Sequence, residues 1–381
     1  MNKHQREREQ AMMQLQQLGL VVSSAIDADP DHDDTPWYLQ LLFGMSGVLA
    51  SLFFIGFLTL VLNQIGISDS PLALFVIGVL LSGIALALFG HQTLRHSPFS
   101  LSLTFAIGVA GQLYMSFALF SSDISEPLSV WLFLLLQIIM TAIMPNLIYR
   151  LLSSVAAQAC VVYLLSFYHV PELALGLLAL ITAVATLQRY TLLSYLPKAS
   201  QKWQNALLEI NKAVGYASAF MLLTVSVFVI ASEYGHVVHG YGGHFYYDYY
   251  LAQGLLILAC LYAAYLILQR YHVRLLSMTG LLIMSAIIAV GAISVYVSGL
   301  LATSLVIVIA VANTQRVLLG LGVLALVSYI FWYYYQLDTS LLVKSASMLI
   351  VGAALLVMRQ LLIHYATSQR LTHPKHKGGK K

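Results

Sequence analysis

Twelve long apolar runs dominate the chain and constrain its fold more than any other feature. A membrane-spanning helix needs about 20 mainly apolar residues, because hydrocarbon cannot satisfy unpaired backbone groups. Runs such as 74–89 do not alternate as barrel strands would. The sequence therefore predicts an all-α, polytopic membrane helix bundle of about twelve transmembrane helices, with ten or eleven as the alternative. The predicted spans cover residues 38–63, 71–90, 100–120, 128–145, 150–168, 172–188, 213–232, 249–269, 275–291, 294–312, 316–334 and 340–363.

Composition agrees with a membrane location. Hydrophobic residues make up 60% of the 381 residues and charged residues only 9%, against roughly 25% charged in a soluble domain. A cytosolic globular enzyme and a disordered chain are therefore excluded. The two cysteines, Cys160 and Cys260, lie inside apolar runs and indicate no disulfide framework. The net charge of +4 and the scattered basic residues favour the lipid bilayer as partner and not nucleic acid.

The distribution of Lys and Arg predicts the orientation. With the N-terminus in the cytoplasm, 18 of the 19 basic residues fall on the inner side. The outer loops hold acidic residues instead, among them Glu126, Glu172 and Asp248. A wrong helix count would exchange the sides of every later loop, so this segregation favours twelve spans. Both termini are expected to be cytoplasmic.

The order of runs and polar segments predicts five parts. Six spans, a polar connection and six further spans form the arrangement of parallel-repeat transporters, in which two halves share one orientation. The parts are a cytoplasmic segment with a short amphipathic helix and an acidic linker (1–36), a first six-helix half (37–188), a cytoplasmic amphipathic linker (189–212), a second six-helix half (213–364) and a basic cytoplasmic tail (365–381).

Lys344 is the one basic residue that breaks the inward rule. An ionisable residue within a span is a functional candidate by default, so Lys344 could bind an anionic group or titrate during transport. Alternatively, its ammonium group snorkels to the outer interface beside an aromatic belt. Four glutamines also lie at membrane depth, where hydrogen bonding between helices is the favoured role: Gln112, Gln137, Gln158 and Gln253.

Glycines within the spans are expected to let helices approach closely. They are Gly44, Gly47, Gly56, Gly280, Gly299, Gly320 and Gly322.

The outer loop after the seventh run is rich in histidine. Imidazole and carboxylate groups are ligands for zinc or copper, and histidine also titrates near neutral pH. The spacing matches no tight metal site, so an aromatic, glycine-rich interfacial loop is the alternative and favoured interpretation. The metal candidates are His236, His239, His244, Glu233 and Asp248. No catalytic motif is found and no cofactor is indicated.

The final third resembles a bacterial family of multi-pass inner-membrane proteins of unknown function. The resemblance rests on the pattern Tyr-Tyr-Tyr-x-Leu followed by Leu-Leu-x-Lys-Ser, within about 270–360. It implies an inner-membrane protein of a Gram-negative bacterium and supplies no activity. It directs attention, as candidates for a substrate or ion site, to Tyr333, Tyr334, Tyr335, Lys344, Ser345, Asn313 and Arg316.

Three functions remain open. The span count and Lys344 favour a secondary transporter or carrier with a polar site near the outer face. The small aqueous area favours a non-catalytic scaffold or assembly partner for envelope proteins, bound to a membrane protein or to a second copy. A membrane enzyme on lipid-linked substrates is the least favoured, so the chain is expected not to be an enzyme.

Overall fold

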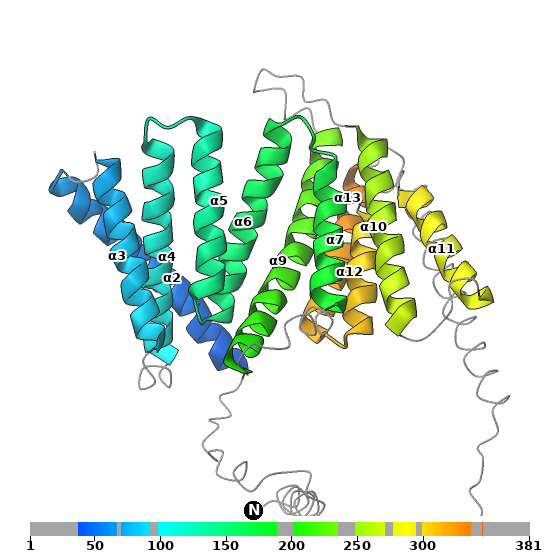
Figure 1. Cartoon of the computed structure of the whole chain (residues 1–381), viewed down its shortest axis with the longest axis horizontal. Helices are drawn as coiled ribbons and strands as arrows, with labels where there is room; N and C mark the ends of the chain where they lie inside the picture. The colour runs from blue at the N-terminus through cyan, green and yellow to red at the C-terminus, as the bar shows by residue number, and fades with distance from the viewer. Residues whose placement is uncertain are drawn as a thin grey trace, which may run out of the picture. The chain divides into compact units, whose positions relative to one another are not determined.

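A computed structural model describes residues 37–66, 70–90, 98–188, 201–234, 248–270, 277–294, 299–336 and 345. These residues form eleven α-helices and no strand (Figure 1). The helices are α2 (Trp37–Gln64), α3 (Pro71–Gly90), α4 (Pro98–Ser121), α5 (Glu126–Ile143), α6 (Leu147–Phe167), α7 (Leu173–Leu187), α9 (Gln201–Tyr234), α10 (Tyr249–Arg270), α11 (Met278–Ser294), α12 (Leu300–Ala312) and α13 (Arg316–Gln336).

The prediction of an all-α membrane protein is confirmed for the described residues. Each of the eleven helices overlaps one of the first eleven predicted spans. Six helices of the described chain are long and apolar enough to cross a membrane, within α3, α4, α5, α6, α9 and α10. The twelfth predicted span, 340–363, lies outside the described residues except for Ser345.

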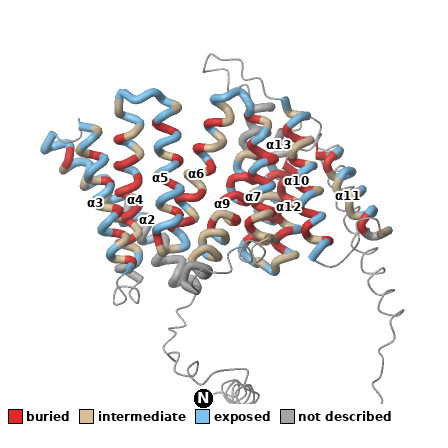
Figure 2. The backbone as a smooth tube through the Cα atoms, in the orientation of Figure 1, coloured by how far each residue is buried: buried red, intermediate tan, exposed pale blue. Residues whose placement is uncertain are grey.

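Besides an apolar core, the helices bury a set of polar side chains and expose many large apolar side chains. On α6, Arg150, Ser153 and Gln158 are buried, whereas Ile148 and Leu152 are exposed. Figure 2 shows the same alternation of buried and exposed positions along the helices. In water such a surface would be costly, because each exposed apolar side chain orders solvent. Lipid is the solvent that this distribution fits.

The described chain divides into two compact units. Unit 1 contains α2 and those parts of α3 and α4 that lie in 78–112. Within it, α3 and α4 approach closely at Gly111. A Cβ atom there would lie 2.5 Å from the Ser82 Oγ and 2.7 Å from the Gly78 carbonyl oxygen. Only glycine leaves room for the facing backbone at this crossing.

Unit 2 takes in 70–77 and the chain from Leu113 onward. Its α5 and α6 pack through Val130, Leu134, Cys160 and Leu164. A larger core joins α7, α9, α10, α12 and α13, with members such as Leu178, Leu222, Leu256, Val306 and Leu318. The core therefore combines α7, from the predicted first half, with helices of the predicted second half. The division into two six-helix halves stays a prediction.

The glycine prediction is confirmed at Gly299 and Gly322, and no described helix approaches Gly56 or Gly320. Gly299 has a φ of 84° and faces the Tyr329 ring, 2.8 Å from the position of a Cβ. Gly322 lies equally close to Ile307. In contrast, no described atom lies within 4 Å of the Cβ positions of Gly56 and Gly320. Those two glycines do not support close approach to a described helix.

Helix α9 is longer than a span requires. Its 34 residues extend about 51 Å, whereas the hydrocarbon core is about 30 Å thick. Its first part, with Glu209 and Lys212, belongs to the sequence predicted as an amphipathic linker. The part of the predicted linker from Gln201 onward therefore forms one continuous helix with the span, and residues 189–200 lie outside the described residues.

Candidate functional site

Apart from Glu209, the described basic and acidic residues of unit 2 lie at opposite ends of its helices. We define the basic end by Arg150, Lys212, Arg270 and Arg316, and the acidic end by Glu126, Glu172 and Asp248. At the basic end, side-chain hydrogen bonds join α6 to α9, α9 to α7, and α7 to the residue after α12. At the acidic end, the Glu172 carboxylate accepts a hydrogen bond from the Asp248 backbone N–H at 3.1 Å. The predicted segregation of charge along these helices is thus present in space.

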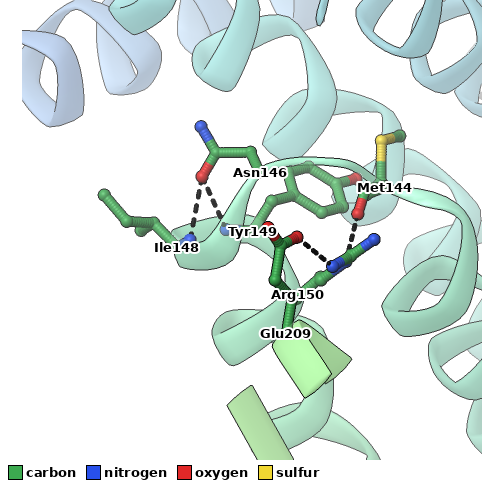
Figure 3. A network of polar contacts seen from close by, with 6 residues as sticks. All are labelled: Met144, Asn146, Ile148, Tyr149, Arg150 and Glu209. Atoms are coloured by element: carbon green, nitrogen blue, oxygen red, sulfur yellow. Dashed lines mark hydrogen bonds and ion pairs between the residues drawn. The ribbon is translucent and has the colours of Figure 1, made fainter. Parts of the chain in front are cut away.

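Arg150 is a buried cation at the basic end. Its side chain is 5% exposed and its Nη1 lies 2.7 Å from the Glu209 Oε2. Its Nε donates to the Met144 carbonyl oxygen, so that the guanidinium group lies between a backbone dipole and a carboxylate (Figure 3). The Glu209 side chain is 58% exposed. The ion pair therefore has one buried partner and one exposed partner.

The break between α5 and α6 positions this arginine. Pro145 disfavours a helical conformation for the residue before it, and Met144 is extended, with ψ 129°. Asn146 then caps α6: its Oδ1 accepts hydrogen bonds from the backbone N–H groups of Ile148 at 2.8 Å and Tyr149 at 3.4 Å. These bonds satisfy two of the free donors that begin a helix. Arg150 follows in the first turn, within reach of the Met144 carbonyl.

Arg150 opens a polar stripe on α6. We use this name for Arg150, Ser153, Ser154 and Gln158, which are all buried. Their spacing of three, four and eight residues places them on one face of the helix. Gln158 donates from its Nε2 to the Ser154 Oγ at 3.4 Å and to the Val214 carbonyl oxygen of α9 at 3.5 Å. The stripe therefore faces α9, the helix that also provides Glu209.

The amide oxygen of Gln158 has no described partner. It is buried and receives no hydrogen bond from the residues that the structure describes. A buried carbonyl oxygen without a donor costs about 1–3 kcal/mol. In contrast, Gln253 is bonded on both sides of its amide, to the Tyr249 hydroxyl at 3.1 Å and to the Ser294 Oγ at 3.5 Å. The predicted hydrogen bonding between helices is thus confirmed for Gln253.

Two asparagines close the C-terminal end of α7. The Asn211 Nδ2 donates to the Ala185 carbonyl at 2.8 Å, and the Asn313 Nδ2 donates to the Thr186 carbonyl at 3.2 Å. Both carbonyls belong to the last turn of α7, which lacks donors of its own. The Asn313 Oδ1 accepts from the Arg270 Nη1 at 2.8 Å. Side chains from three other elements thus hold this helix end.

We expect Asn211→Ala and Asn313→Ala each to lower the free energy of unfolding by about 1 kcal/mol, because each leaves a carbonyl of α7 without its donor. The measurement is unfolding in detergent micelles on titration with sodium dodecyl sulfate. Lys212→Ala, at an exposed neighbouring position, is the control and should change stability little. A double asparagine variant no less stable than either single variant would contradict separate capping.

At the acidic end, hydrogen bonds join neighbouring helices. The Asp248 Oδ1 accepts from the backbone N–H groups of Tyr250 and Leu251 at 3.1 and 3.2 Å, and so caps α10. The Tyr163 hydroxyl donates to the Glu126 Oε1. The Trp131 Nε1 donates to the Tyr168 hydroxyl at 3.3 Å. Tyrosine and tryptophan are typical of a membrane–water interface.

Of the seven site candidates named from the sequence, three have described side chains. Asn313 bonds to Thr186 and Arg270, and Arg316 is exposed at the start of α13. Ser345 is exposed. Tyr333, Tyr334 and Tyr335 belong to the end of α13, but their side chains lie outside the described residues, as does Lys344. The substrate-site prediction for this set stays a prediction.

The metal prediction also falls mostly outside the described chain. His236, His239 and His244 lie there, as does the side chain of Glu233. The carboxylate of Asp248 is engaged in capping α10. The described residues contain no group of three metal-ligating side chains.

Sequence reasoning missed the pairing of Arg150 with Glu209, which are 59 residues apart. One signal was available. Glu209 is an acid in a connection that is otherwise rich in basic residues, next to a predicted span. An acid in that position indicates a cationic partner, and Arg150 begins a predicted span at the same side.

The comparisons identify a family but no activity. No curated protein and no solved structure matches the chain. One family covers nearly all of it, including the part in which the sequence resembled a family of unknown function. Residues 36–365 match the family described as Domain of unknown function (DUF4401), and the chain belongs to that family.

Proposed function

We propose that the protein is a secondary carrier that moves a small anionic solute across a bacterial inner membrane, along the polar stripe between α6 and α9. The observation that carries this proposal is the ion pair of Arg150 and Glu209, buried on one side and exposed on the other. An ionisable residue kept inside a membrane protein is costly and is a functional candidate by default.

The exposure of Glu209 would allow it to dissociate from Arg150. A carboxylate with most of its surface in water can leave the guanidinium group at low cost, since water solvates the free charge. Arg150 cannot follow, because its side chain is buried and bonded to Met144. The Arg150 donors that Glu209 leaves would then require another anion, since a buried unpaired charge is strongly unfavourable. The guanidinium fork matches carboxylate and phosphate groups.

In the proposal, the polar stripe lines the path of such an anion inward from Arg150. Ser153, Ser154 and Gln158 continue the same face of α6 at successive turns. In the proposed cycle the Arg150–Glu209 pair closes the basic end while the carrier is empty. A solute anion replaces Glu209 on Arg150, passes the two serines and reaches Gln158.

The proposal includes the finer points of topology. We propose twelve spans, both termini in the cytoplasm and the basic end on the cytoplasmic side. Lys344 with Tyr333, Tyr334, Tyr335 and Ser345 would form a second polar site at the outer face. A membrane partner or a second copy stays a prediction.

Flux into liposomes tests the function. Purified protein in proteoliposomes should take up at least one labelled anion from a panel of lactate, propionate, succinate, glycerol 3-phosphate and inorganic phosphate. Arg150→Gln should reduce this uptake about tenfold or more, because the loss of a charged hydrogen bond of 1.5–3 kcal/mol corresponds to a factor of that order. Lys212→Gln, which removes an exposed positive charge at the same end, should leave uptake unchanged.

Two results would overturn the proposal. One is uptake no faster than in protein-free liposomes for every anion in the panel. The other is equal uptake by wild type and Arg150→Gln, with both variants monodisperse and helical in detergent. Stable capture of a membrane protein by a transport-inactive chain would instead support the scaffold function.

A further inference from the structure

We infer that Gln158 is a selectivity residue, and that the transported anion carries a hydroxyl, amide or ammonium hydrogen-bond donor. This inference rests on the proposed function and names its substrate class. It starts from the Gln158 Oε1, a buried oxygen that no described residue satisfies.

The Nε2 of Gln158 is the amide atom with described partners, and its Oε1 is the atom without one. Gln158 is 7% exposed. Its Nε2 is directed to the Ser154 Oγ and to the Val214 carbonyl, at 3.4 and 3.5 Å. Both partners accept through oxygen, and both lie on the facing surfaces of α6 and α9. The oxygen of the same amide is left as an acceptor at membrane depth.

A free acceptor selects for a donor. In hydrocarbon, a carbonyl oxygen that is closed off without a donor loses its solvation and regains nothing. A solute that brings an O–H or N–H group restores that bond, whereas an isosteric solute without one does not. Sites built to hydrogen-bond a polar group discriminate strongly against analogues that lack it.

The distance along α6 separates selection for a donor at Gln158 from binding of the negative charge at Arg150. Gln158 is eight residues from Arg150, about 12 Å along the helix axis. A small solute therefore meets Arg150 and Gln158 in sequence and not together. Arg150 requires a negative charge, and Gln158 then requires a donor. A hydroxy or amino carboxylate, or a hydroxylated phosphate ester, meets both conditions.

Matched pairs of anions test the inference in the same proteoliposomes. The pairs are lactate with propionate, and glycerol 3-phosphate with propyl phosphate, whose members differ only in hydroxyl groups. Wild type should transport the hydroxylated member of at least one pair about tenfold faster, the factor that one hydrogen bond supplies. Gln158→Met, which keeps the length of the side chain and removes its oxygen, should bring this ratio close to one.

Gln253→Met is the matched control, because it makes the same change at a buried glutamine whose amide is already bonded. It should keep the wild-type ratio. A wild-type rate ratio of hydroxylated to unhydroxylated anion near one would overturn the inference, and so would an unchanged ratio in Gln158→Met. In both cases, measurable flux of an anion would still support the carrier. Absence of flux for every anion would overturn the carrier and the inference together.

Discussion

Gly111→Ala is expected to destabilise unit 1 by about 1–3 kcal/mol, the usual cost of overpacking. The added methyl group would meet the Ser82 Oγ at 2.5 Å, the Gly78 carbonyl oxygen at 2.7 Å and the Ser82 backbone nitrogen at 2.8 Å. Two of these three atoms belong to the backbone of α3, which cannot turn aside as a flexible side chain can. The helices must separate, and the small-residue contact between them is lost. Gly111→Val should cost more than Gly111→Ala.

Gly83→Ala provides the control on the facing helix. No described atom lies within 4 Å of its Cβ position, and alanine has a helix propensity about 1 kcal/mol better than glycine. This variant should match or slightly exceed the wild type in detergent-titration unfolding. Equal stability of the Gly111 and Gly83 alanine variants would show that the crossing at Gly111 does not hold α3 and α4 together.

Glu209→Gln is expected to destabilise unit 2 by about 2 kcal/mol, below the 3–5 kcal/mol typical for a broken buried pair. The reduction follows from the 58% exposure of the Glu209 side chain, which lets water replace part of its role. The double variant Arg150→Met and Glu209→Gln should be no less stable than Glu209→Gln alone, because it removes the charge that Glu209→Gln leaves unpaired.

A double-mutant cycle measures this coupling. Free energies of unfolding of wild type, both single variants and the double variant should give an interaction energy of about 1–3 kcal/mol. Strict additivity would mean that the contact at 2.7 Å contributes nothing to the folded state. Raised salt should weaken the coupling only in part, since screening acts on the exposed carboxylate more than on the buried guanidinium group.

The helices could be predicted from the sequence because the lipid solvent alone requires them. Any apolar run of the required length must close its own backbone hydrogen bonds in lipid, so eleven predicted spans overlap with helices. The start of α9 was predicted as a separate linker on its polarity. It continues the span instead, because no proline or glycine lies between Gln201 and Val214 to interrupt it.

The candidate site was less predictable because it depends on which helices meet. Gly56 and Gly111 look alike in sequence, yet only Gly111 lies at a described crossing. Likewise, Gln158 and Gln253 are both buried glutamines, and only the position of neighbouring helices decides that one amide is fully bonded. Pairing between distant helices is not encoded in local pattern, and so Arg150 and Glu209 were not linked.

The contact between Asn313 and Thr186 has a consequence for biogenesis. The donor of this hydrogen bond lies 127 residues after its acceptor. At a synthesis rate of 5–20 residues per second, the ribosome adds that length in about 6–25 s. During this interval the newly inserted α7 has an open carbonyl that the nascent chain cannot yet fill. A chain truncated before Asn313 should therefore be a substrate for membrane proteases, whereas one truncated just beyond it should persist longer in a pulse–chase experiment.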